Sequence, residues 1–143
     1  MIRTLLLAAV LTTTALPAFA QEHQGHWFGE GEGNITADLT HVENDIYKIS
    51  LSTIVPISDQ GGGCAGGIDG EVLLDKKGGN FFVENEDYDP KGESSPLNAR
   101  YCEIGLTFNE DGTLTTEERS GCLYYHGAAC GFSGTLEHDA AGL

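Results

Sequence analysis

Basic side chains are scarce in this chain of 143 residues, which has seven Lys and Arg against 22 Asp and Glu and a formal net charge of −15. Nucleic-acid binding needs clustered basic residues that face phosphates, and docking onto an anionic membrane surface needs the same. The composition therefore argues against both kinds of partner. It favours a well-solvated charged surface, and it permits a basic protein partner attracted by the long-range field.

Long apolar runs are also missing after residue 20. The chain opens with Arg3, an apolar stretch over residues 5–16 and the small-x-small pattern Ala18-Phe19-Ala20, which together are typical of a secretory signal peptide. The stretch is too short to span a bilayer, which takes about 20 apolar residues. We therefore expect residues 1–20 to be removed and residues 21–143 to form one periplasmic or secreted domain without membrane insertion.

All four cysteines lie in the part expected to be exported: Cys64, Cys102, Cys122 and Cys130. An even number of cysteines in an oxidising compartment predicts two disulfides. Structural zinc sites usually contain a tight Cys-x2–4-Cys pair, which this sequence lacks, and a catalytic Cys–His pair needs a free thiolate. We therefore expect a disulfide-linked domain with no cofactor.

Helical periodicity is weak after residue 20, whereas alternating runs rich in Thr, Val, Ile, Tyr and Phe recur. These runs predict strands at Trp27–Val42, Ile46–Val55, Cys64–Leu74, Asn80–Glu86, Ala99–Phe108, Thr113–Ser120 and Cys130–Glu137. Three glycines in the first run indicate that it bends, bulges or breaks.

Short turns between these runs predict hairpins, one of them with Gly112 in a left-handed conformation. In that hairpin one face consists of Cys102, Ile104, Leu106 and Phe108, and we assign it to the core. The predicted fold is all-β: a small up-and-down antiparallel barrel, or a curled meander, of about seven or eight strands. A β-sandwich is the alternative.

An up-and-down order would gather the four cysteines at one end of the barrel. We favour a Cys122–Cys130 bond, which closes a short loop, and this leaves Cys64–Cys102 as the second bond. The pairing of Cys64 with Cys130 and of Cys102 with Cys122 is compatible with the same topology.

The loop between Cys122 and Cys130 contains Tyr124, Tyr125 and His126. One interpretation is a rigid recognition loop that presents aromatic area to a partner. For His126 we favour the other interpretation, a structural ring hydrogen-bonded to the loop backbone, because no carboxylate partner is visible nearby in the sequence.

Other motifs do not support an enzyme. Ser133 lies in Cys-Gly-Phe-Ser-Gly, where the spacing of a nucleophile elbow is wrong and no helix follows. The acidic segment 84–93 departs from the EF-hand pattern at two ligand positions. Cleavage after residue 20 would place His23 third from a free amine, with His26 close by, which suits copper(II) or nickel(II). Disordered terminal residues are the default for this segment.

Three segments carry a resemblance to known proteins: GCAGGIDGEVLL from Gly63, YCEIGLTF from Tyr101 and GCLYYHGAACGFSGTL from Gly121. Together they resemble a group of small exported bacterial β proteins with this cysteine frame and a YHGAACGFSG ending. In size, export and barrel pattern the chain is also similar to periplasmic lysozyme inhibitors. That similarity implies an acidic barrel with a loop in the cleft of a basic enzyme, but it transfers no inhibitory residue, because the sequence contains no inhibitor-specific motif.

These observations lead to one main expectation about function. We expect a non-enzymatic exported binding protein with a basic protein partner, and inhibition of a basic host enzyme such as lysozyme is one form this would take. The alternative is a periplasmic carrier of a small molecule or metal ion. The oligomeric state does not follow from the sequence.

Overall fold

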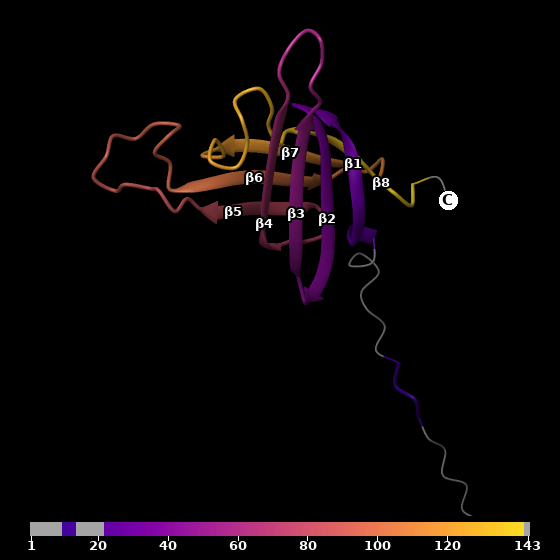
Figure 1. Ribbon diagram of the computed structural model, residues 1–143. Helices are drawn as coiled ribbons and strands as arrows, with labels where there is room; N and C mark the ends of the chain where they lie inside the picture. The colour runs from indigo at the N-terminus through magenta and orange to yellow at the C-terminus, as the bar shows by residue number, and fades with distance from the viewer. Residues whose placement is uncertain (1–9, 14–21, 142–143) are drawn as a thin grey trace, which may run out of the picture.

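Eight antiparallel strands form a single curled sheet in the computed structural model, which describes residues 10–13 and 22–141 (Figure 1). The strands are β1 (Gly25–Gly31), β2 (Asn34–Glu43), β3 (Ile46–Val55), β4 (Cys64–Leu73), β5 (Gly78–Glu84), β6 (Tyr101–Phe108), β7 (Leu114–Ser120) and β8 (Gly134–His138). Their spatial order is β4-β3-β2-β1-β8-β7-β6-β5. Pairing of the first and last strands joins two four-stranded halves into one curled sheet. This sheet has the shape of a nearly closed barrel, which confirms the predicted all-β fold.

The barrel is open between β4 and β5, which are the two edge strands of the sheet although they follow each other in the chain. Strands β2 to β4 cross β5 to β7 at a steep angle in Figure 1, so these two edge strands diverge from their connecting turn. Side chains fill the gap between them. A Cβ on Gly70 of β4 would lie 2.9 Å from the ring of Phe81 of β5, so the glycine makes room for that ring.

The alternation predicted for the strands is confirmed by burial. In β3 the side chains of Tyr47, Ile49, Leu51 and Thr53 are buried, and in β6 those of Cys102, Ile104 and Leu106 are buried, with Phe108 packed against them. Trp27, Phe81 and Phe132 complete the centre of the core. Burial of each such side chain contributes about 1.5–3 kcal/mol to folding, which makes this inner face the main source of stability.

Five of the predicted runs match observed strands to within two residues at each end, and two differ by more. The first is interrupted at residues 32 and 33 and gives β1 and β2, so the fold has eight strands. The last strand begins at Gly134, because the preceding residues belong to a loop. Gly112 has a φ of 86°, as predicted for its turn.

The predicted signal segment 1–20 lies outside the described residues, apart from 10–13, where Val10 and Leu11 are exposed. Within the described part of the chain, no helix is long and apolar enough to cross a membrane.

Both predicted disulfides are present, but the pairing that we favoured is wrong. Cys64 is bonded to Cys130 and Cys102 to Cys122, with Cα–Cα distances of 5.8 and 4.4 Å. Strand adjacency decides the second bond. Strand β6 pairs with β7 as far as Glu103 and Ser120, and Cys102 and Cys122 lie one and two residues beyond this last pair. Two disulfides indicate that the protein folds in an oxidising, extracellular type of compartment.

Candidate functional site

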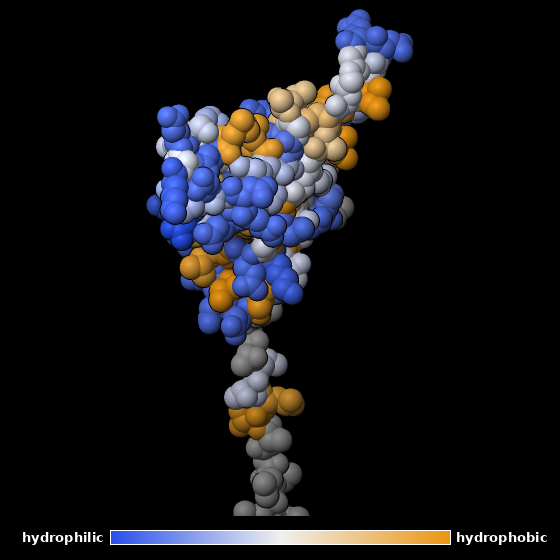
Figure 2. Space-filling view, turned by 60° about the vertical axis from the view of Figure 1, so that its left-hand side comes forward, coloured by the Kyte–Doolittle hydropathy of each residue, from blue (hydrophilic) through white to orange (hydrophobic). Residues whose placement is uncertain are grey.

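The candidate site lies at the end of the barrel that carries both disulfides, which we call the cysteine end. This end includes three loops: the β3–β4 loop (residues 56–63), the β5–β6 loop (85–100) and the β7–β8 loop (121–133). The β3–β4 loop projects from the body of the barrel in both whole-molecule views (Figures 1 and 2). Its tip is a tight turn in which Ser58 and Gly61 exchange backbone hydrogen bonds of 3.1 and 3.2 Å.

The β7–β8 loop crosses from one edge of the barrel opening to the other. On the β4 side, the Gly67 N–H donates to the Tyr125 carbonyl at 2.9 Å, and Gly66 and His126 form an isolated antiparallel bridge. On the β5 side, the side-chain amide of buried Asn85 donates to the Gly121 carbonyl at 2.9 Å. The loop therefore continues the sheet beyond β4 and covers the opening at this end.

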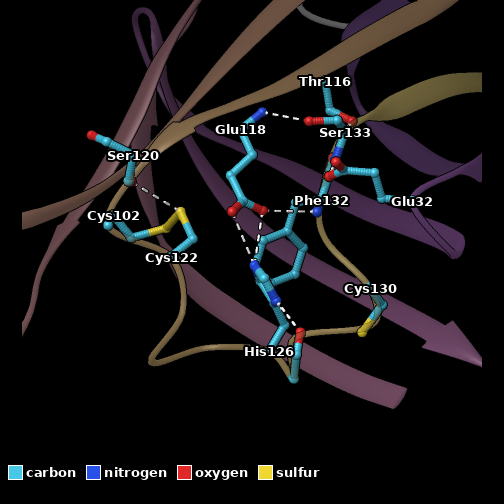
Figure 3. Close-up of polar contacts among 12 residues, drawn as sticks. Glu32, Cys102, Thr116, Glu118, Ser120, Cys122, His126, Cys130, Phe132 and Ser133 are labelled. Carbon is cyan, nitrogen blue, oxygen red and sulfur yellow. Dashed lines mark hydrogen bonds and ion pairs between the residues drawn. A yellow bond between two sulfur atoms is a disulfide. The ribbon is translucent and has the colours of Figure 1, made fainter. Parts of the chain in front are cut away.

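A carboxylate from β7 holds the centre of this loop (Figure 3). Nε2 of His126 lies 3.0 Å from both carboxylate oxygens of Glu118, and its Nδ1 lies 2.6 Å from the Gly127 carbonyl. Oε2 of Glu118 also accepts the Phe132 N–H at 3.0 Å. The His126 side chain is only 4% exposed, so β7, the middle of the loop and the loop residues that lead into β8 are linked through one buried group.

These contacts determine the protonation state of the His126 ring. The Gly127 carbonyl can only accept a hydrogen bond, so Nδ1 must carry a proton. The Glu118 carboxylate, which already accepts from a backbone N–H, is best satisfied by a proton on Nε2 as well. The geometry is therefore that of an imidazolium paired with a carboxylate.

The pKa of His126 is raised above its ordinary value of 6.5, in agreement with this geometry. Burial is the largest single influence and would lower the pKa. The hydrogen bonds with the Gly127 carbonyl and Glu118, together with the negative charges of Glu118 and Glu32, outweigh burial.

This arrangement is suited to structure rather than to proton transfer. Both nitrogens of His126 donate to fixed acceptors, so neither is placed to remove a proton from a substrate. Ser133, the residue in the nucleophile-like motif, instead accepts the Glu118 N–H through its Oγ at 2.9 Å. What the pair can do chemically is fix the loop in one conformation.

The three residues predicted as a binding surface have different surroundings. Tyr124 is exposed and its hydroxyl donates to the Leu97 carbonyl, which ties two loops together. Tyr125 is half-buried against the core, with its hydroxyl 3.4 Å from the Glu84 carbonyl. His126 lies beneath them as the buried anchor, so its ring contacts the loop backbone as in the interpretation we favoured.

The two histidines considered for a metal lie at the opposite end of the barrel or on its outer face. His23 is buried and stacks on Phe108 with ring centroids 3.5 Å apart, and burial lowers its pKa. His26 contacts Asp38, with Nδ1 2.7 Å from the carboxylate. Within residues 10–13 and 22–141 no group of three or more His, Cys, Asp or Glu side chains is arranged to hold a metal ion, and the amine expected at Gln21 lies outside these residues.

Sequence reasoning missed Glu118, although a signal for it exists. Leu114 and Thr116 are buried on the inner face of β7, and the two-residue period places Glu118 on that same face. A carboxylate in phase with core residues at the end of a strand needs a partner, and His126 is eight residues further on.

Comparison of the chain with protein families, with curated proteins and with solved structures found no match.

Proposed function

We propose that this chain is a non-enzymatic, exported binding protein that engages a basic protein partner through the loops of its cysteine end. The observation that carries the proposal is the position of the exposed large hydrophobic side chains. Six of the ten such side chains between residues 22 and 141 lie at this end: Ile54, Ile57, Leu97, Tyr101, Leu123 and Tyr124.

These side chains belong to a surface that is otherwise hydrophilic. Figure 2 shows separate apolar patches on a largely polar face. Exposed aliphatic and aromatic side chains on disulfide-held loops are typical of a recognition surface, because little conformational entropy is lost when a partner binds. Leu123 and Tyr124 lie in the first part of the β7–β8 loop, whose backbone is held by the His126–Glu118 pair.

The charge of the chain supports a basic partner. The formal net charge is −15, and the β5–β6 loop beside Tyr124 carries Glu86, Asp87, Asp89 and Glu93. Such a field accelerates association with a positively charged protein and repels an acidic one. A basic enzyme such as lysozyme is a candidate of this kind.

The alternative of a carrier that uses the barrel interior has less support. The interior is occupied by large side chains, among them Trp27, Tyr47, Phe81 and Phe132, all at most 3% exposed. A bound ligand would have to displace well-packed core groups, which costs stability.

The proposal is tested by binding of two basic probe proteins, lysozyme and cytochrome c, to the immobilised oxidised protein, with an acidic albumin as control. We expect binding at about 0.05 M salt that weakens strongly at about 0.5 M, since exposed charges are screened over a shorter distance. Leu123→Ala and Tyr124→Ala should each weaken binding by about tenfold.

Leu73→Ala is the matched control, since Leu73 is also exposed, at 67% against 40% for Leu123, but lies at the far end of β4. It should leave the affinity unchanged. Failure of both basic probes to bind, or an equal loss in Leu73→Ala, would refute the proposed surface.

A further inference from the structure

An open groove of about 530 Å³ lies at the cysteine end beside the buried His126–Glu118 pair. Its walls come from three separate segments: the β1–β2 turn with the strand ends beside it (residues 30–34), the end of β3 and the residue after it (54–56), and the β7–β8 loop (128–130). A volume of this size accommodates a side chain together with adjacent backbone of a bound chain.

The groove combines negative charge with apolar walls. Glu30 and Glu32 line one side, and none of the lining residues is Lys or Arg. Ile54, Val55 and Pro56 add apolar lining from the end of β3, and Ala128 and Ala129 add small side chains from the β7–β8 loop. A long side chain with an aliphatic stem and a cationic head matches this pattern, because the stem packs on the apolar wall while the head reaches the carboxylates.

The walls are fixed before any partner arrives. The Glu32 N–H donates to the Ser133 carbonyl at 2.9 Å, and the Gly131 N–H donates to the Glu32 carbonyl at 3.0 Å. On the loop side Cys130 lines the groove and is bonded to Cys64 at the start of β4. A preformed groove loses little entropy on binding, so a single inserted side chain can contribute usefully to affinity.

We propose that this groove receives an arginine or lysine side chain of the basic partner, with its cationic group beside Glu30 and Glu32. This inference rests on the proposed function and specifies the chemistry by which the partner is recognised. Because the groove is open, the ion pair adds specificity and a moderate share of the affinity, while the exposed hydrophobic side chains supply the remainder.

The test uses a neutral analogue of arginine as its control. The oxidised protein, labelled with nitrogen-15, is titrated with acetyl-Ala-Arg-Ala-amide and with the same tripeptide containing citrulline, which has the shape of arginine without its charge. We expect saturable amide shifts at residues 31–34 and 128–130 with the arginine peptide, and much smaller shifts with the citrulline peptide. Equal affinity for both peptides, or arginine-specific shifts confined to other strands, would overturn the proposal.

Two variants test the location of the site, and a third variant is the matched control. Glu30→Gln should lower the affinity for the arginine peptide by about three- to tenfold. Ala128→Trp should abolish the shifts by filling the groove, and Ala128 is exposed, so the fold can accept the larger side chain. Glu110→Gln removes the same charge from the exposed β6–β7 turn at the other end of the barrel and should have no effect. An equal loss in Glu30→Gln and Glu110→Gln would show a net-charge effect and refute the groove.

The groove and the proposed function can fail separately. If lysozyme or cytochrome c binds in a Tyr124-dependent manner but the arginine peptide does not shift the groove amides, the groove inference is wrong and the binding surface stands. If the arginine peptide enters the groove but neither basic protein binds, the groove stands and the protein-binding function is refuted.

Discussion

Gly66 of β4 and His126 of the β7–β8 loop approach so closely that a Cβ on Gly66 would lie 2.3 Å from the Cβ of His126. The same Cβ would lie 2.6 Å from the Tyr125 carbonyl, so the loop packs directly on the strand backbone. This contact fixes the position of the loop that carries Leu123 and Tyr124 relative to the barrel opening.

Replacement of Gly66 by alanine should therefore push the loop away from β4. We expect a loss of about 1–3 kcal/mol in the free energy of unfolding, because the added methyl group meets backbone that cannot rotate aside. Gly67→Ala is the matched control, since its Cβ would meet only the Leu51 carbonyl at 3.6 Å, and both variants keep their N–H groups. Urea unfolding of the two variants measures the difference, and equal stabilities would contradict the packing described.

The His126–Glu118 pair should show a large coupling energy. His126→Asn alone or Glu118→Gln alone removes one charged partner and leaves the other buried, so each should cost about 2 kcal/mol. The double variant should cost clearly less than the sum of the two, because it leaves no buried charge. Strictly additive losses in a double-mutant cycle would show that the two side chains do not act as a pair.

The two buried histidines should make stability depend on pH in opposite directions. For His126 the folded-state pKa is raised, so between 6.5 and that pKa the folded state binds more protons than the unfolded state. Its contribution is complete below 6.5 and is lost as the pH rises through the folded pKa. His126→Asn should flatten this alkaline decline in a series of urea unfolding curves, and an unchanged slope would contradict the assignment.

For His23 the sign is reversed. Its pKa is lowered, chiefly by burial, while its hydrogen bond to the Asp75 carbonyl acts in the opposite direction. Below 6.5 the unfolded state therefore binds the additional proton, and stability falls as the pH decreases toward the folded pKa of His23. Proton NMR should show His23 titrating at lower pH than His126, and the opposite order would refute both environments.

The two disulfides should differ in what they stabilise. The Cys64–Cys130 bond spans 66 residues and the Cys102–Cys122 bond spans 20. By restricting the unfolded chain, they should stabilise the folded state by about 4 and 3 kcal/mol, respectively. Removal of the Cys64–Cys130 bond by paired serine substitutions should also loosen the groove wall and weaken binding of the arginine peptide. The paired variant of Cys102 and Cys122 should leave peptide binding closer to that of the unchanged protein. Peptide mapping of the oxidised protein provides an independent check of the connectivity.

Much of the fold could be predicted from the sequence because strand periodicity is a local signal. The alternation of Tyr47, Ile49, Leu51 and Thr53 identifies the buried face of β3 without any knowledge of its neighbours. The glycine interruption of the first run and the left-handed Gly112 are likewise local properties of the backbone.

The barrel opening could not be predicted in this way. The turn after β4 has the hydrogen bonds of an ordinary hairpin, with Asp75 accepting from Lys77 and Gly78 through its side chain. Strands β4 and β5 nevertheless end as the two sheet edges, and Phe81 packs between them against Gly70, a contact between residues that are eleven positions apart in the chain. Nothing in the turn itself marks the two strands as sheet edges.

The cysteine pairing was mispredicted for a related reason. Cys122 and Cys130 are close in sequence, but the loop between them crosses the opening, so its two ends lie beside different strands. Glu118 was missed because its role depends on the inward direction of one strand position and on the return of the loop above it.

Residues 125–127 pair with the first part of the β4 edge, residues 65–67, and this has a consequence for association between copies of this chain. An accessible edge strand presents a row of backbone donors and acceptors to which a strand from another molecule can add. Reduction of both disulfides would free the loop and expose this part of the edge as well, so light scattering should detect more oligomers of the reduced protein than of the oxidised protein. The two disulfides that shape the binding surface would then also limit self-assembly.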